Sequence, residues 1–342
     1  MKRLSHISGL KLWAMLLLAG STLGSCNILD EEEMDCAVYV SFKYDMNMEF
    51  TDAFSNAVNS VTLYAFDKDG ILAFQKTEEG EPLKQDGYRM RLDDISRSEK
   101  AQYDFITWAG EPDNESFSIP VLTVGKSTKE ELICQLNRAG NGIVNDDLDD
   151  LFHGQANDLS FGRSTSVVDE VSIPLTKNTN NIRIILQHVT GNPINVNDFK
   201  FIITDKNGKM NYDNTLMADE QLTYHAWYTA NGYVGMDKVE GRQEGVSEVN
   251  VAIAELTVAR LMTDEEPILT VIGKDDKVVL SIPLVDCALL YKRAKYNNMS
   301  AQEFLDREDE YNLTFFLDEN NKWISSSIII NSWKLVFNDM EL

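Results

Sequence analysis

The chain has few of the residues on which catalysis and metal binding depend. It contains four histidines and four cysteines in 342 residues, and it has no His-Glu-x-x-His, Gly-x-Ser-x-Gly, Cys-x-x-Cys or glycine-rich phosphate-binding motif. Acidic residues are abundant, but no pair stands out as the two carboxylates of a glycosidase. The sequence therefore predicts a protein that is not an enzyme and that holds no metal ion or cofactor.

Positive charge is also scarce. Lysine and arginine together number 31, against 55 aspartates and glutamates, and the formal net charge is −24. A chain with this balance repels phosphate backbones and anionic lipid head groups. We therefore expect no nucleic acid among its partners.

The cysteines are too scattered for a cross-linked scaffold. Apart from Cys26 they are Cys36, Cys134 and Cys287. An odd set at such distances fits neither a disulfide framework nor a zinc site with paired ligands. Two interpretations stay open: a disulfide between Cys36 and Cys134, if both lie in one domain, or buried thiols that behave as small apolar side chains.

The apolar run near the N-terminus, Leu12–Leu18, is too short to cross a bilayer, which needs about 20 residues. Basic residues precede it and small residues follow it, which is typical of a secretory signal. The segment Leu23-Gly24-Ser25-Cys26 resembles the lipobox of bacterial lipoproteins, in which the thiol takes a diacylglycerol. We expect a signal peptide over residues 1–25 and, on Cys26, a covalent lipid with two or three acyl chains such as palmitate, which together give lasting attachment to the outer membrane.

An acidic run follows within a few residues of Cys26. It resembles the surface-export tag of lipoproteins from anaerobic Gram-negative bacteria of the gut and mouth. The alternative is a solvated linker, and in either case residues 26–36 form a tether. The run consists of Asp30, Glu31, Glu32 and Glu33.

Alternating apolar and polar residues, the pattern of half-buried strands, recur along the rest of the chain. Residues 36–44 are the first case, with Val38, Val40 and Phe42 on one face. Short strands at such intervals with few helices are typical of stacked β-sandwiches. The other expected strands are residues 58–66, 71–74, 88–92, 103–108, 171–175, 181–188, 199–205, 222–228, 249–258, 267–272, 278–283, 311–317 and 328–337, with 88–92 and 103–108 in a sheet interior.

We place a domain boundary in the polar segment Thr176–Asn180, which has turn chemistry and no apolar residue. The expected fold class is all-β with minor helices, in an N-terminal sandwich over residues 37–177 and a C-terminal one over 178–342. The strand and turn at Thr62–Gly70 are repeated at Phe199–Gly208, which suggests that the second domain copies the first.

Three segments have helical signals. Asp146–Gly154 begins with acids and ends with glycine, Val285–Lys295 ends with basic residues, and Ser300 opens a capping box before residues 303–310. Residues 132–136, after a capping box at Ser127, fit one face of a helix, and a strand fits them almost as well. The Asp67–Gly70 turn predicts a hairpin and not a calcium loop, because Ile71 stands where a ligand is needed.

Three strings of residues resemble the FimB-like family of anchor subunits of fimbrillin-type fimbriae. The first is Phe42–Met48 with Asp52–Phe54 and Val58–Tyr64, the second is Leu148–Gly154, and the third, the most specific, is Met299–Tyr311. The resemblance covers most of the chain after the signal. The departures at Ala65 and at residues 333–335 are local.

This resemblance implies two tandem transthyretin-like sandwiches on a surface-exposed outer-membrane lipoprotein. Its role would be to tether the base of a fimbria and to limit fimbrial growth, with the fimbrial shaft or basal subunit as partner. Two other functions stay open. One is a glycan-binding surface lipoprotein with Trp108, Trp227 or Trp323 as an aromatic platform, and the other is a surface hydrolase.

The contact with the fimbria is expected at a strand edge, because an unpaired edge recruits a strand from another chain, as fimbriae of this family are described to do. In the terminal run Trp333, Leu335 and Phe337 alternate with Lys334, Val336 and Asn338, so one side of the strand is apolar. This strand, or the groove beside it, completes the sandwich of the basal subunit; alternatively, the strand fills its own domain.

Overall fold

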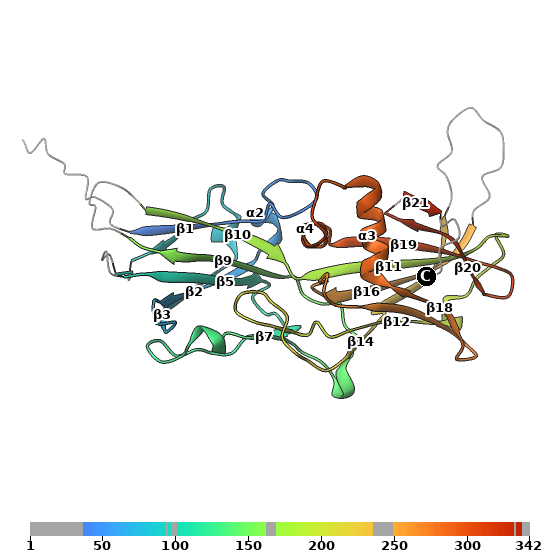
Figure 1. The fold of residues 1–342 in the computed structure, drawn as a ribbon, viewed down its shortest axis with the longest axis horizontal. Helices are drawn as coiled ribbons and strands as arrows, with labels where there is room; N and C mark the ends of the chain where they lie inside the picture. Colours follow the sequence, from blue (N-terminus) through green and yellow to red (C-terminus); the bar gives the residue numbers. More distant parts are fainter. Residues whose placement is uncertain are drawn as a thin grey trace, which may run out of the picture.

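The computed structural model describes residues 37–93, 95–96, 101–161, 169–234, 249–331 and 333–336. Within these residues the chain forms sheets of seven, six, five and three strands with only short helical segments. The molecule is elongated, and most strands run along its long axis (Figure 1). The prediction of an all-β fold with minor helices, built as stacked sandwiches, is confirmed.

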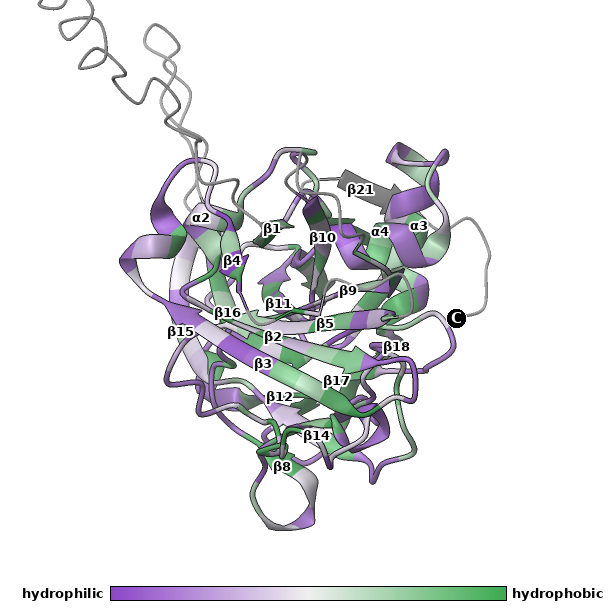
Figure 2. Cartoon of the chain, turned by 90° about the vertical axis from the view of Figure 1, so that its left-hand side faces the viewer, coloured by the Kyte–Doolittle hydropathy of each residue, from purple (hydrophilic) through white to green (hydrophobic). Residues whose placement is uncertain are grey.

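The seven-stranded sheet forms the N-terminal half. It is bent, because residues 169–174 of its fifth strand pair in parallel with the next strand, while residues 175–177 pair with the preceding one. Figure 2 shows β1 and β10 on one side and β2, β3 and β5 on the other. In sheet order the strands are β3 (Leu72–Glu79), β2 (Ser60–Asp67), β5 (Tyr103–Gly110), β9 (Leu151–Leu159), β10 (Asp169–Lys177), β1 (Val38–Lys43) and β4 (Met90–Leu92).

The C-terminal half packs a six-stranded sheet against a five-stranded one. The six-stranded sheet is β15 (Tyr228–Val234), β16 (Val249–Ala259), β11 (Thr179–His188), β19 (Glu310–Leu317), β20 (Trp323–Ile330) and β21 (Trp333–Val336). The five-stranded sheet is β18 (Val278–Pro283), β17 (Ile268–Gly273), β12 (Phe199–Asp205), β14 (Leu222–His225) and β8 (Ile143–Val144).

A three-stranded sheet joins the halves, with β13 (Lys209–Met210), β7 (Cys134–Leu136) and β6 (Phe117–Ser118). The α-helices are α2 (Phe54–Ala57), α3 (Leu284–Lys295) and α4 (Ala301–Arg307). Single 3₁₀ turns are η1 (Glu81–Lys84), η2 (Lys129–Glu131), η3 (Gly140–Gly142) and η4 (Val196–Asp198). α3 lies beside β18 and β21, at the end strands of the two sheets that form the second sandwich.

Two hydrophobic cores share the first sheet. Along β2, Leu63 and Ala65 belong to a cluster enclosed by the bent sheet, whereas Tyr64 and Phe66 belong to a second cluster on its other face. All four are buried, which explains why this strand is apolar on both faces. The second cluster continues through the C-terminal half and therefore crosses the predicted domain boundary.

The predicted boundary segment Thr176–Asn180 is not a turn. Its residues end β10 and begin β11, and only Asn178 lies between the two strands. In addition, β7 and β8 from the first half pair with β13 and β14 from the second. The chain changes sheet at Asn178, and a domain boundary there stays a prediction.

The helix expected over Asp146–Gly154 is wrong. Residues from Leu151 onward form β9, because Leu151 and Phe152 face opposite cores and are both buried there. Gly154 is not a helix cap. A side chain on it would place its Cβ 2.5 Å from the carbonyl oxygen of Pro174, so glycine is needed for the close approach of β10.

The other helical predictions agree more closely with the structure. The prediction of a helix over Val285–Lys295 is confirmed by α3, and Ser300 caps α4 by accepting a hydrogen bond from the Glu303 amide at 3.1 Å. α4 ends at Arg307, earlier than expected. The capping box expected at Ser127 lies one residue later, at Thr128 and Glu131, and the open segment 132–136 contains strand β7.

Several strand expectations need correction. β4 is an edge strand and not an interior one, whereas β5 is interior as expected. The single strand expected over residues 222–228 is split between β14 and β15, which belong to different sheets. The strand and turn at Phe199–Gly208 do not repeat the β2–β3 hairpin, because β12 pairs with β14 and β17 and β13 pairs with β7.

Candidate functional site

The predicted lipidation and export residues lie outside the described part of the chain. These are Cys26, Asp30, Glu31, Glu32 and Glu33, and Cys36 and Phe337 lie outside it as well. Cys134 and Cys287 are free and buried. Burial raises the pKa of the Cys287 thiol to about 12, so it behaves as a small apolar side chain.

The terminal strand β21 lies at one edge of the six-stranded sheet and pairs only with β20 among the described strands. Trp333 is opposite Ile330 and Leu335 is opposite Ile328, and both isoleucines are buried in the core. Opposite residues of a ladder occupy the same face, so Trp333 and Leu335 take register positions on the core face. The edge of β21 that faces away from β20 is the candidate site for an added strand.

The three tryptophans considered as glycan platforms differ in exposure. Trp108 is 2% exposed, and its indole nitrogen has no hydrogen-bond partner among the described residues. Trp323 is partly buried against the core. Only Trp227, which is 39% exposed, presents a ring at the surface.

The three strings that carried the family resemblance meet where the two halves join. Lys177 at the end of β10 forms ion pairs with Asp150 at 2.9 Å and with Asp309 at 2.8 Å. Burial alone would lower the pKa of Lys177, but the charges of Asp309 and Asp150 outweigh it and raise the pKa above its ordinary value. Lys177 therefore stays charged and connects the second string to the third.

Arg307 at the end of α4 connects the third string to the first. Its guanidinium donates hydrogen bonds to the carbonyl oxygens of Asp45 at 2.9 Å and Asn47 at 3.3 Å, in the loop after β1. Glu303, one helical turn earlier, forms an ion pair with the same guanidinium at 3.1 Å. The family strings thus contribute several of the contacts that hold the halves together.

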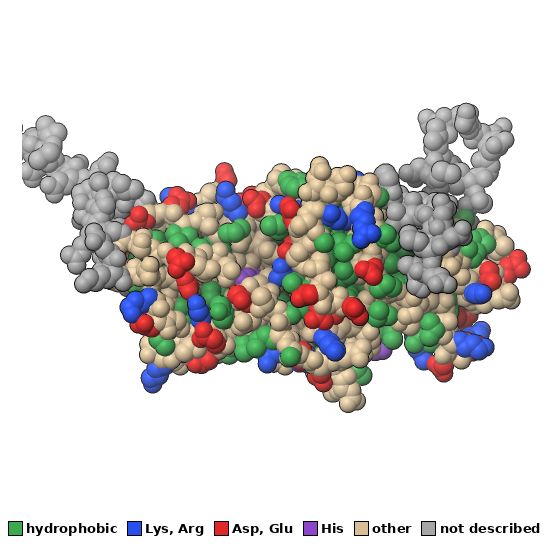
Figure 3. Space-filling model, in the orientation of Figure 1, with side chains coloured by type: hydrophobic (Ala, Val, Ile, Leu, Met, Phe, Trp, Pro, Cys, Tyr) green, Lys and Arg blue, Asp and Glu red, His purple; other side chains and the backbone are tan. Residues whose placement is uncertain are grey.

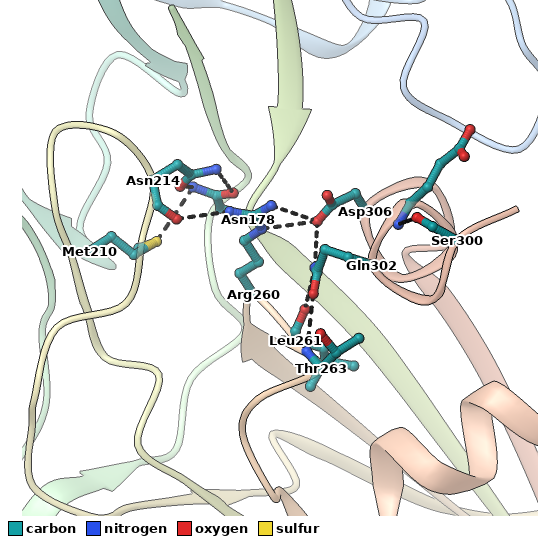
Figure 4. Close-up of polar contacts among 10 residues, drawn as sticks. Asn178, Met210, Asn214, Arg260, Leu261, Thr263, Ser300, Gln302 and Asp306 are labelled. Carbon is teal, nitrogen blue, oxygen red and sulfur yellow. Dashed lines mark hydrogen bonds and ion pairs between the residues drawn. The ribbon is translucent and has the colours of Figure 1, made fainter.

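Beside these ion pairs lies a buried polar network, drawn in Figure 4. Asn178, the residue between β10 and β11, exchanges two side-chain hydrogen bonds with Asn214, at 2.7 and 3.1 Å. Both side chains are buried. Their amides satisfy each other, so the chain crosses from one sheet to the other without an unpaired polar group at this residue.

Arg260 extends the network toward α4. Its guanidinium donates to the Asn214 carbonyl at 2.8 Å and to the Asp306 carboxylate at 2.7 and 3.0 Å. Gln302 donates to the same carboxylate at 2.9 Å and accepts from the Thr263 amide at 3.0 Å. Because Arg260 and Asp306 are only 11% and 14% exposed, each depends on the other for compensation of its buried charge.

His153 adds a further link across the halves. Its Nε2 lies 2.8 Å from the Tyr212 carbonyl oxygen, and its ring packs edge-on against Trp108. Burial lowers the pKa of His153 to about 4, so the ring is neutral and Nε2 donates. His153, which stands in no catalytic or metal-binding motif, is thus a structural residue.

The sequence reasoning missed this junction. Arg260, Gln302 and Asp306 have no local pattern that marks them as partners of Asn178 and Asn214. One signal was available, because the apolar-free segment Thr176–Asn180 stands between two strongly apolar strands. A polar segment in that place needs buried partners if it is not a turn.

Within the described residues no helix is long and apolar enough to cross a bilayer. The side chains on the face drawn in Figure 3 mix acidic and basic groups without a large basic patch.

Comparisons with known proteins agree with one another. A family model described as fimbrillin-A associated anchor proteins Mfa1 and Mfa2 matches residues 32–339. A crystal structure of a candidate adhesin from Bacteroides thetaiotaomicron is 33% identical, with a TM-score of 0.76, over 88% of this chain and 97% of that one. A candidate polysaccharide-binding protein of the same organism is 32% identical, with a TM-score of 0.75, over 89% and 99% of the two chains.

The fimbrial anchor protein Mfa2 of Porphyromonas gingivalis is similar in fold. It is 18% identical, with a TM-score of 0.64, over 88% of this chain and 99% of that one. A comparison with curated protein sequences finds no significant match. Because the family model spans most of the sequence and a relative at 33% identity aligns almost end to end, the chain belongs to the Mfa2 family of fimbrillin-A associated anchor proteins.

Proposed function

We propose that this protein is a non-enzymatic outer-membrane lipoprotein that anchors the base of a fimbria to the cell surface and limits fimbrial growth. Membership of a family of fimbrial anchor proteins over residues 32–339 is the observation that carries the proposal. Lipid on Cys26 attaches the chain to the membrane, and Asp30–Glu33 direct it to the outer surface. The partner is the fimbrial shaft or its basal subunit.

The distance from the lipid to the fold is compatible with this role. β1 begins at Val38, twelve residues after Cys26, and an extended chain of that length spans at most about 40 Å. The first sandwich therefore lies close to the membrane. The second sandwich, at the other end of the elongated molecule (Figure 1), is left for the fimbria.

We further propose that the basal subunit is bound by strand complementation at β21. The outer edge of this strand is unpaired among the described residues, and an unpaired edge is a template for a strand from another chain. The core-face register of Trp333 and Leu335 also supports the alternative that β21 fills its own domain. The two roles are compatible if the edge, and not the core face, makes the contact.

The polar junction supports an anchoring role in another way. A tether for a long filament must carry a pulling load from one sandwich to the other. Buried ion pairs and amide pairs with fixed directions resist sliding of the halves more than a plain apolar interface would. The ion pair of Lys177 with Asp309 crosses the junction, and so does the hydrogen bond of His153 to the Tyr212 carbonyl oxygen.

The test is a crosslink in intact cells. A cysteine at Asn338, just beyond β21, should form a disulfide with a cysteine introduced into the basal subunit. Val278→Cys provides the control, because Val278 is 61% exposed on β18, an edge strand of the other sheet. A crosslink from position 338 alone supports complementation at β21.

Deletion of residues 333–342 tests the same edge without a label. We expect fimbriae to detach from cells that still display the lipoprotein. Circular dichroism of the purified variant establishes whether the second sandwich remains folded. If it does and fimbriae stay attached, the contact lies on another edge.

A further inference from the structure

A shallow cleft on the outer face of the six-stranded sheet has no role in the anchoring function proposed above. It has a volume of about 170 Å³ and is lined by the side chains of Asp147, Asn181, Arg183, Trp227, Glu255 and Glu310. We call it the Trp227 cleft. Closed ligand pockets usually measure about 300–1,000 Å³, so this one suits a single ring that lies against a surface.

The strand registers place these side chains in two rows. Asn181 of β11 is opposite Thr257 of β16 and beside Glu310 of β19. Arg183 is opposite Glu255, which is opposite Tyr228 of β15. Residues opposite each other in a ladder share a face, so the floor of the cleft is built on the neighbouring strands β11, β16 and β19. Trp227 and Asp147 come from the segments just before β15 and β9.

Trp227 forms one wall of the cleft with its ring partly open to solvent. It is 39% exposed, and the ring of Tyr228, 47% exposed, lies 5.9 Å away. The backbone amide of Trp227 donates to the Glu255 carbonyl at 3.0 Å, which fixes the start of its side chain relative to the sheet. A large aromatic ring held in place at the surface is an unused apolar platform.

The polar groups around the ring are already ordered. Arg183 donates to Glu255 at 2.9 Å, Asn181 donates to Glu310 at 3.0 Å, and Thr257 donates to Asp147 at 2.5 Å. Each carboxylate has about four acceptor positions, so these contacts leave acceptors free. Arg183, which is 52% exposed, also has further N–H groups. Donors and acceptors therefore alternate around an aromatic surface.

This combination selects the chemistry of the ligand. An anionic ligand would face three carboxylates and a chain of net charge −24. A cationic ligand would be attracted by the carboxylates, but an ammonium group has no acceptor for the remaining N–H groups of Arg183. Sugar hydroxyls both donate and accept hydrogen bonds, and the C–H groups of a sugar ring carry the weak positive charge that the negative face of an indole attracts.

We propose that the Trp227 cleft binds a neutral glycan, with one sugar ring stacked on Trp227 and its hydroxyls bonded to Arg183, Glu255 and Glu310. The anchor would then hold surface polysaccharide as well as a fimbria. This inference is independent of β21, because the cleft lies on the face of the sheet and not at that edge.

The test uses the full-length protein in detergent on an array of neutral oligosaccharides of glucose, galactose, mannose and N-acetylglucosamine. Sulfated and sialylated counterparts and an oligolysine peptide are included. We expect binding to at least one neutral glycan, a loss of about tenfold or more with Trp227→Ala, and partial retention with Trp227→Phe, which keeps an aromatic face. Tyr233→Ala, which removes another exposed aromatic ring, is the matched control and should bind as wild type.

Circular dichroism shows whether each variant is folded, and Trp227 is exposed enough that its removal should leave the core intact. The proposal is overturned if no neutral glycan binds, or if Trp227→Ala binds as well as wild type. Binding only to anionic glycans, or Trp227-dependent binding of oligolysine alone, would also overturn it.

Discussion

The guanidinium carbon of Arg307 lies 4.6 Å from the centre of the Phe50 ring. The same guanidinium bonds to the Asp45 carbonyl, 262 residues away in sequence. Phe50 is 56% exposed and has a backbone φ of 54°, which is strained for a non-glycine residue. The contacts with Arg307 hold the loop after β1, with Phe50 in this conformation, against the end of α4.

The buried pair of Arg260 and Asp306 should dominate the stability of the polar network beside the junction. Asp306→Ala leaves the Arg260 charge buried with only the Asn214 carbonyl, and we expect a loss of about 3 kcal/mol in the free energy of unfolding. Urea denaturation measures this. The matched control is Lys200→Ala, which breaks an ion pair whose partners are 67% and 80% exposed and should cost less than about 0.5 kcal/mol. Equal losses for both variants would contradict the structural importance of the network.

Stability should rise on mild acidification because of Asp205. Burial raises the pKa of this carboxyl to about 7, and its Oδ2 has no hydrogen-bond partner among the described residues. The folded state therefore holds a proton that the unfolded state loses near pH 4, so this group's contribution falls as pH rises from about 4 to 7 and is constant above. Glu308, whose pKa burial also raises to about 7, acts in the same direction.

His153 acts in the opposite direction. Its pKa is lowered to about 4 by burial, so between about pH 6.5 and 4 the unfolded state binds the extra proton and stability falls as pH falls.

Comparison of an Asp205 variant with the wild type separates the effect of Asp205 on stability from that of His153. Asp205→Asn should be more stable than wild type at pH 8, and this advantage should shrink at pH 5. Asp276→Asn, on the exposed turn after β17, should show no such change. A pH-independent effect of Asp205→Asn would refute the assignment.

The proposed lipid anchor is tested at Cys26, the expected attachment residue. Cys26→Ala should leave the signal uncleaved or release an unlipidated chain, because the thiol that takes the diacylglycerol is gone. Mass spectrometry of the mature N-terminus shows whether the signal is cleaved and whether residue 26 carries a lipid. An unmodified residue 26 in the wild-type protein would eliminate the lipoprotein assignment.

The acidic run should control display and not lipidation. Replacing Asp30, Glu31, Glu32 and Glu33 by asparagine or alanine should keep the lipid but remove the protein from the outer surface. Protease treatment of whole cells distinguishes the two locations. Equal digestion of wild type and variant would mean that the run is a solvated linker.

Local patterns predicted much of the fold. The alternation of Val38, Val40 and Phe42 matches β1, and Asp67 forms the expected turn by accepting from the amides of Asp69 and Ile71 at 2.9 and 3.0 Å. The family of fimbrial anchors was also recognisable. These features depend on neighbours in sequence, where periodicity and turn chemistry carry direct information.

Partners distant in sequence were not predictable. The acids at 146–150 look like a helix start, yet Asp149 accepts from the amides of Glu115 and Ser116, and Asp150 pairs with Lys177. The Trp227 cleft likewise combines residues from three strands with the segments before β9 and β15. Nothing in the local sequence around Trp227 states whether its ring faces the core or the solvent.

The near-continuity of β10 and β11 determines how the fold bears a mechanical load. A pull that enters at the start of β1 and leaves through β11 acts along β1 and β10, which run parallel. Their hydrogen bonds are then loaded together in shear and are not opened one at a time, as in peeling. β11 and β19 are parallel in the same way. Rupture along this axis requires many bonds to fail at once, so the protein should withstand tension far better than a thermodynamic stability of ordinary size would suggest.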